Sequence, residues 1–131
     1  MTNKEIIQQM YADFGQGNIP GILNVLNDDI TWDTPGPAII NWAGVRNGKA
    51  GVMDFFEQIR SSTVYEKFES LVFIEEGDKV VAHGIANFTT TTTGKTGVSP
   101  WTMLWNLNNG KALHVNNLRE RMPLPKHLSK F

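Results

Sequence analysis

Residues 68–121 read FESLVFIEEGDKVVAHGIANFTTTTTGKTGVSPWTMLWNLNNGKALHVNNLRER, and this stretch decides the fold class. It breaks into extended runs at EEGD (75–78), TGKTG (93–97) and LNNG (107–110). β-branched and aromatic residues, which favour strands, fill the runs, and Asn109-Gly110 is typical of a tight hairpin. The five threonines at 89–93 are interpreted as a strand near its turn. The stretch therefore predicts a meander of long antiparallel strands.

The residues before this stretch carry helical patterns. Thr2 and Glu5 fit a capping box. Apolar residues then recur at helical spacing until GQG at 15–17, namely Ile6, Ile7, Met10, Tyr11 and Phe14. Asn18 and Pro20 predict the start of a short second helix, which carries Ile22, Leu23, Val25 and Leu26.

A strand, DITWDT (29–34), follows and runs into the prolines of PGP at 35–37. We expect a loop over 36–48 and then a third helix through Val52, Phe55, Phe56 and Ile59. Helices first and antiparallel strands afterwards predict an α+β fold, with the N-terminal helices packed on one face of a curved, mostly antiparallel sheet.

Composition narrows the classes of function. The 131 residues suit one domain over 1–131, with 40% hydrophobic and 19% charged residues. The net charge is -1 and no Lys/Arg run occurs, which disfavours nucleic-acid binding. The chain has no cysteine, and no histidine-carboxylate cluster or glycine-rich run has metal or phosphate-loop spacing, so no cofactor is indicated. Charges interrupt the apolar N-terminal positions, so we expect a cytoplasmic protein without a membrane contact.

The order of these parts resembles the nuclear transport factor 2-like superfamily, and within it the SnoaL-like group of polyketide cyclases and ketosteroid isomerase relatives. The matching runs are MYADFGQGNIPGILNVLNDDITWDTPGP (10–37), GKAGVMDFFEQI (48–59), EEGDKVVAHGIANFTTTTTG (75–94), SPWTMLW (99–105) and NGKALHV (109–115). The resemblance implies a cystatin-like cone, in which helices close over a bent, mixed sheet and leave a deep apolar pocket. It does not imply one chemistry, because this fold carries several.

The family's catalytic carboxylates are replaced in this chain. In ketosteroid isomerases a helix tyrosine and a protonated aspartate hold the enolate oxygen, and a second aspartate moves the proton. Tyr11 matches the tyrosine, but the two aspartates fall at Thr102 and Thr34. The base of the polyketide cyclases falls at Asn117, which is predicted to face the pocket while Asn116 faces away. An amide hydrogen-bonds but accepts no proton near neutral pH.

Other residues could supply the chemistry. His83 is a candidate base, although a lone strand histidine is more often structural. Asp33 is a second candidate base, but successive side chains of a strand face opposite sides, so Asp33 faces away from the pocket if Thr34 faces into it. His114 is predicted to face outward. Arg119 could bind a ligand oxyanion or form a rim salt bridge.

Apolar side chains are expected around the pocket. The ligand-binding set predicted from the resemblance comprises Tyr11, Trp32, Thr34, Trp42, Phe56, Thr102, Leu104, Val115, Asn117 and Arg119. Tyr11 fits a core residue as well as an oxyanion donor. Phe55 and Phe56 also fit simple core packing. Trp42 could cover the opening of the pocket.

Two functions remain open. The first is an isomerase or cyclase that moves a proton on a small apolar carbonyl compound, with Tyr11 and Asn117 at the oxyanion and His83 or Asp33 as base. The second is a binding module without turnover. A homodimer is also expected. If Thr102, Leu104 and Asn106 face the cone, the outer face of the same strand carries Trp101, Met103 and Trp105, a stripe too apolar to leave in water. The rival reading turns both tryptophans into the cone.

Overall fold

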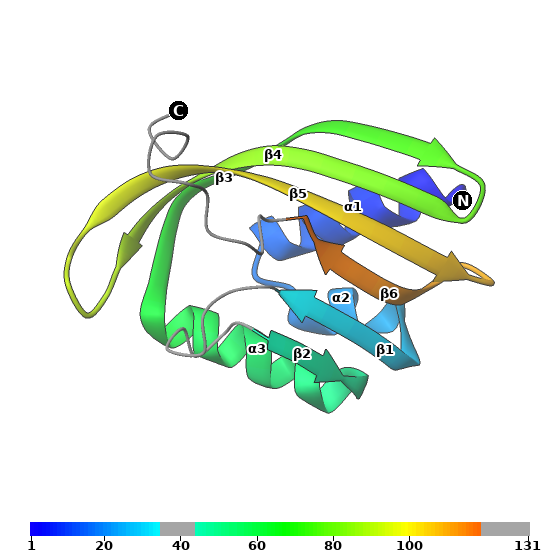
Figure 1. The fold of residues 1–131 in the computed structure, drawn as a ribbon, viewed down its shortest axis with the longest axis horizontal. Helices are drawn as coiled ribbons and strands as arrows, with labels where there is room; N and C mark the ends of the chain where they lie inside the picture. The colour runs from blue at the N-terminus through cyan, green and yellow to red at the C-terminus, as the bar shows by residue number, and fades with distance from the viewer. Residues whose placement is uncertain (35–43, 119–131) are drawn as a thin grey trace, which may run out of the picture.

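The computed structural model describes residues 1–34 and 44–118 (Figure 1). Within these ranges the elements in chain order are α1 (Asn3–Gly15), α2 (Ile19–Asn24), β1 (Leu26–Thr34), β2 (Gly44–Asn47), α3 (Gly48–Ser62), β3 (Thr63–Glu76), β4 (Lys79–Thr90), β5 (Thr96–Asn108) and β6 (Lys111–Asn117). The α+β class predicted from the sequence is confirmed.

Local sequence signals determine the helix starts and the hairpin turn. The side chain of Thr2 accepts a hydrogen bond from the Glu5 amide and Glu5 bonds back to Thr2, so the capping box forms. Asn18 caps α2 by accepting from the Gly21 amide. Asn109 and Gly110 both have positive φ, at 52° and 77°, as a tight β5–β6 turn requires.

The six strands form one mixed sheet in the order β2-β1-β6-β5-β4-β3. All neighbours are antiparallel except β1 and β6, which run parallel. In Figure 1 the long strands β3, β4 and β5 arch over the helices. The core lies between this inner face and the helices, and includes Ile7 of α1, Ile22 of α2 and Val52 of α3.

Strand register assigns each side chain to a face. One inner row joins Phe73, Ala82, Met103 and Asn117, and a second joins Val80, Trp105, Val115 and Trp32. One outer row joins Ile74, Val81, Leu104, Asn116 and Asp33. Trp105, in the second inner row, is completely buried.

Two expectations about the strands are wrong. The loop expected over 36–48 contains a strand, β2, which pairs with β1. The tryptophans Trp101 and Trp105 point into the cone, and Thr102, Leu104 and Asn106 lie on the outer face. A two-residue period places Met103 inside with the tryptophans, so the rival reading of this strand is the correct one.

Among residues 1–34 and 44–118, no helix combines the length and the apolar character needed to cross a bilayer.

Candidate functional site

A cavity of about 520 Å³ lies between α3 and the inner face of the sheet. This volume falls in the range of ligand pockets, roughly 300–1,000 Å³. The described residues that line it are Thr34, Phe55, Ile59, Ser62, Thr63, Tyr65, Phe68, Ala86, Phe88, Thr90, Thr92, Ser99, Pro100, Trp101, Met103 and Asn117. None of these side chains is charged, so the described wall suits an uncharged ligand. We call this space the large cavity.

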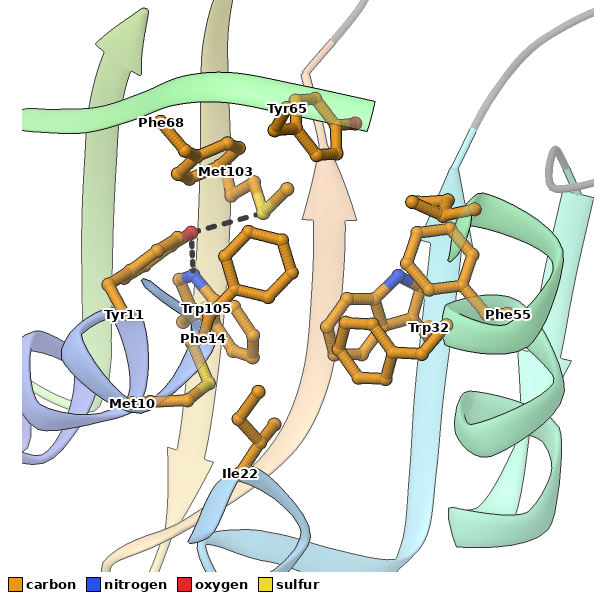
Figure 2. Close-up of a pocket in the computed structure, with 12 residues that line it drawn as sticks. Met10, Tyr11, Phe14, Ile22, Trp32, Phe55, Tyr65, Phe68, Met103 and Trp105 are labelled. Atoms are coloured by element: carbon orange, nitrogen blue, oxygen red, sulfur yellow. Dashed lines mark hydrogen bonds between the residues drawn. The ribbon is translucent and has the colours of Figure 1, made fainter. Parts of the chain in front are cut away.

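A second space of about 60 Å³ adjoins the large cavity and is enclosed mainly by aromatic side chains (Figure 2). We call it the small chamber. Its lining residues are Met10, Tyr11, Phe14, Ile22, Trp32, Phe55, Phe56, Ile59, Tyr65, Phe68, Met103 and Trp105. Phe55, Ile59, Tyr65, Phe68 and Met103 line both spaces. A volume of this size holds a small substituent rather than a whole ligand.

Tyr11 lies at the centre of a buried polar contact in the small chamber. Its hydroxyl accepts a hydrogen bond from Trp105 Nε1 at 3.1 Å and donates to Met103 Sδ at 3.1 Å (Figure 2). Its ring stacks on Trp101, with 5.0 Å between ring centroids. Burial raises the pKa of Tyr11 well above its ordinary value, although the bond from Trp105 acts in the opposite direction. The hydroxyl is therefore a neutral donor at physiological pH.

Three buried side-chain atoms have no hydrogen-bond partner among the described residues: Thr34 Oγ1, Trp101 Nε1 and Asn117 Oδ1. All three residues line the large cavity. An unsatisfied buried polar atom costs about 1–3 kcal/mol, so most such atoms in folded proteins have a partner. Their concentration around one cavity distinguishes it from ordinary core packing.

The residues matched to the family's carboxylates separate in space. Thr34 and Asn117 line the large cavity together, and Tyr11 lines the adjoining small chamber. Thr102 instead lies on the outer face, where its Oγ1 is 2.9 Å from His83 Nδ1. The expectation that Thr102 shares the cavity is therefore wrong.

Both candidate bases lie on the outer face. His83 pairs in register with Thr102 and Val72, and its bond to Thr102 is a structural contact. Asp33 pairs with Asn116, and both face the side of the sheet opposite to that of Thr34 and Asn117, the next residues along their strands. Neither is among the residues that line the two spaces, so the roles considered for them as base do not fit their positions. His114, in register with Asn106, also lies on this face.

The remaining predicted ligand-binding residues divide as follows. Trp32 and Phe56 line the small chamber. Val115 is buried on the inner face but lines neither space, and Leu104 lies on the outer face. Trp42 and Arg119 lie outside the described residues.

The ligand-binding set expected from the resemblance left out two wall residues, Trp101 and Met103, and only the rival reading turned Trp101 inward. The signal was the alternation W-x-M-x-W over 101–105, whose large apolar members share one face of a strand. Gly84 was missed as well, and it makes room for Trp101: a Cβ there would lie 2.3 Å from the indole ring. Within the described residues, no three His, Asp or Glu side chains gather as a metal site would need.

A family model for the SnoaL-like domain matches residues 7–115. The chain belongs to the SnoaL-like family. The conical fold described above is the fold expected from the resemblance, with helices on a mixed, mostly antiparallel sheet. No match was found among curated proteins.

Solved structures with the same fold cover nearly the whole SnoaL-like chain. A nuclear transport factor 2-like protein of unknown function from Burkholderia pseudomallei has a TM-score of 0.84 at 23% identity, covering 92% of this chain and 93% of its own. A candidate polyketide cyclase from Pseudomonas putida has a TM-score of 0.79 at 22% identity, with 92% of each chain covered. TerC, co-crystallised with polyporic acid, has a TM-score of 0.79 at 28% identity, covering 90% of this chain and 91% of its own.

Proposed function

We propose that this SnoaL-like protein binds a small, largely apolar, uncharged hydroxycarbonyl compound in the large cavity. The observation that carries the proposal is the set of three unpartnered polar atoms at this cavity, Thr34 Oγ1, Trp101 Nε1 and Asn117 Oδ1. Each would gain a hydrogen bond from a ligand that presents oxygen at the matching position.

The chemistry of these atoms specifies the ligand. An indole N–H can only donate, so Trp101 requires an acceptor such as a carbonyl oxygen. Asn117 Oδ1 can only accept, so it requires a donor such as a hydroxyl group. Thr34 can do either. The apolar remainder of the wall includes the aromatic side chains of Phe55, Phe68 and Phe88, which suit an aromatic frame.

The ligand of one relative supports this chemistry. TerC, 28% identical to this chain, was co-crystallised with polyporic acid. Polyporic acid is an aromatic hydroxyquinone and carries both carbonyl and hydroxyl oxygens on an apolar frame. Only the ligand class is transferred to this chain, since the compound itself is TerC's.

A cyclase or isomerase is the second candidate, and membership of the SnoaL-like family favours it. Proton transfer needs a base within hydrogen-bond reach of the reacting carbon. The described lining residues include no carboxylate and no imidazole. The neutral donors Tyr11 and Trp101 could stabilise an enolate oxygen but could not remove the proton, which is why binding ranks first.

Titration calorimetry at pH 6 with 6-hydroxy-1-tetralone, whose phenol is uncharged at this pH, tests the binding proposal. We expect this probe to bind, and we expect weaker binding of tetralin, which has the same frame without the oxygens. Trp101→Phe keeps an aromatic ring but removes the donor, so affinity should fall about fivefold, as for a neutral hydrogen bond of about 1 kcal/mol.

Thr102→Val is the matched control for Trp101→Phe, because the two residues are adjacent on β5 but face opposite sides of the sheet. It should leave the affinity unchanged. The proposal is contradicted if 6-hydroxy-1-tetralone does not bind, or if Thr102→Val weakens binding as much as Trp101→Phe does. Exchange of the protons next to the tetralone carbonyl in D₂O, faster with protein than without, would place the cyclase or isomerase reading first.

A homodimer is also proposed. Because Trp101 and Trp105 lie inside the cone, this proposal rests on other apolar side chains of the outer face. Apolar side chains on the outer face of β3 are exposed: Val72 is 43% exposed and Ile74 is 59% exposed. Ile74 pairs across the strands with Val81, which pairs in turn with Leu104, so these three form one apolar row. Two copies of this face in an isologous contact would cover them. Sedimentation should show a dimer that Ile74→Glu dissociates. Met53→Glu, an exposed change on α3, should leave it intact, and a monomeric parent protein would refute the proposal.

A further inference from the structure

Met103 lies in the wall between the small chamber and the large cavity. It is one of the residues that line both spaces. Its sulfur accepts the hydrogen bond from the Tyr11 hydroxyl. Tyr11 itself lines the small chamber but not the large cavity. Figure 2 shows the Met103 side chain directed toward the Tyr11 oxygen. The Met103 thioether therefore accepts the hydrogen bond that the Tyr11 hydroxyl could otherwise donate to a ligand.

Trp105 fixes the direction of that donor. Because the Tyr11 oxygen accepts from Trp105 Nε1 at 3.1 Å, its proton is directed to the remaining partner, Met103 Sδ, also at 3.1 Å. Trp105 is itself completely buried, so the geometry of this relay is held by the core. Only the last member, the flexible Met103 side chain, can leave without disturbing the rest.

We propose that Met103 is a movable partition and a specificity-determining residue: its side chain covers the Tyr11 hydroxyl until the oxygen of a bound ligand replaces Sδ. This inference rests on the proposed function, since it assigns the Tyr11 hydroxyl as a further donor for the same ligand. Displacing Met103 joins the small chamber to the large cavity and admits a longer ligand.

The chemistry of the exchange favours the ligand. A thioether sulfur is a weak acceptor, so a carbonyl or enolate oxygen offers Tyr11 a better bond. Methionine has three rotatable side-chain bonds and no branch, which lets it move within a packed wall at low cost. The Tyr11 proton stays in place as a donor, because burial raises the pKa of the phenol.

The first test needs no ligand. With ¹³C-labelled methionine methyl groups, the Met103 resonance is assigned by its loss in Met103→Leu. In the parent protein this methyl should report one fixed rotamer, and in Tyr11→Phe it should report averaging among rotamers, since its hydrogen bond is gone. If the Met103 methyl showed the same degree of rotamer averaging in both proteins, the proposal that Tyr11 holds Met103 in place as a partition would be overturned.

The second test measures affinity for 6-hydroxy-1-tetralone by calorimetry. Leucine ends one bonded atom short of methionine and has no acceptor, so Met103→Leu leaves the Tyr11 hydroxyl uncovered and unpaired. Affinity should rise about fivefold in this variant. In the Tyr11→Phe background the same substitution should change affinity by less than about twofold, because the donor that Met103 covers has been removed.

An equal effect of Met103→Leu in the two backgrounds would overturn the assignment of Tyr11 as the uncovered donor. Failure of the proposed function looks different. In that case neither the parent protein nor Met103→Leu would bind the probe, while the methyl comparison would still decide whether Tyr11 holds Met103. Binding by Met103→Leu but not by the parent protein would support a partition that closes the small chamber.

Discussion

Gly84→Ala is expected to destabilise the protein by about 3 kcal/mol or more. A Cβ on residue 84 would lie 2.0 Å from the Glu69 carbonyl oxygen and 2.3 Å from the Trp101 ring. The first of these neighbours is backbone in the adjacent strand, so it cannot turn away as a side chain would. Glycine in a strand interior often marks such a close approach.

The substitution should also damage the large cavity. Trp101 stacks against both Tyr11 and Phe68, with ring centroids at 5.0 Å and 4.9 Å, so its displacement disturbs the aromatic wall as a unit. Chemical denaturation would measure the loss of stability, and near-ultraviolet circular dichroism would report the loss of fixed tryptophan packing. Affinity for any cavity ligand should fall in parallel.

Gly15→Ala is the matched control. Residue 15 is the last position of α1, its φ is not positive, and an added Cβ would meet no atom within 4 Å. Alanine favours helix over glycine, so the control should be neutral or slightly stabilising, by up to about 1 kcal/mol. If Gly84→Ala resembled the control, the close packing of Trp101 against β4 would be refuted.

Local chemistry in the sequence predicted most of the fold. The capping box, the Asn18 cap and the Asn109-Gly110 turn each act within a few residues, and each is present in the structure. β2 could not be found in this way. Its residues Gly44–Asn47 are mostly exposed and lack an alternating pattern, and the strand exists because the edge of β1 offers backbone partners.

The structure agrees with the expected direction of the matched side chain on β6 and disagrees with it on β5. Asn117 was placed in the cavity by the family match, and the pairing of β6 with Met103 agrees. On β5 the match placed Thr102 inside, although alternation around Trp101 and Trp105 indicates the opposite face. A resemblance can shift by one residue within a strand, and each one-residue shift reverses every side chain. Burial of large apolar residues is the stronger signal.

Unpartnered atoms could not be predicted from sequence, because hydrogen-bond satisfaction depends on contacts between distant strands. Trp101 Nε1 has no partner among the described residues, whereas Trp105 Nε1, four residues away on the same strand face, bonds Tyr11. The two indoles have the same chemistry, and they differ in whether a hydrogen-bond acceptor lies within reach of Nε1. Their difference separates a core contact from a candidate ligand contact.

Asn117→Asp is expected to make stability strongly dependent on pH. Asn117 Oδ1 is buried, and no described side chain that lines the cavity is cationic. Desolvation will therefore raise the pKa of the new carboxyl above the ordinary aspartate value of about 3.9. The folded protein will hold this proton at pH values where the unfolded chain has lost it.

The sign follows from proton linkage. Below about pH 4 the carboxyl is protonated in both states, so the variant should be close to the parent protein in stability. As pH rises from about 4 toward the raised pKa, the unfolded chain loses its proton first. The free energy of unfolding should then fall by about 1.4 kcal/mol per pH unit relative to the parent protein, and level off above the raised pKa.

Denaturant titrations of both proteins between pH 4 and pH 8 measure this difference, and Asn108→Asp provides the control. Asn108 is exposed at the end of β5, so the pKa of a carboxyl there should stay near its ordinary value, or slightly below it because of the neighbouring Lys111, without such a loss of stability. The same Asn117→Asp protein also tests chemistry, because it returns a carboxyl to the position where the resemblance places the cyclase base. If the cavity binds 6-hydroxy-1-tetralone, the variant should accelerate exchange of the protons next to its carbonyl, with a rate that rises through the raised pKa. A stability difference that does not change with pH would mean that residue 117 is in contact with water.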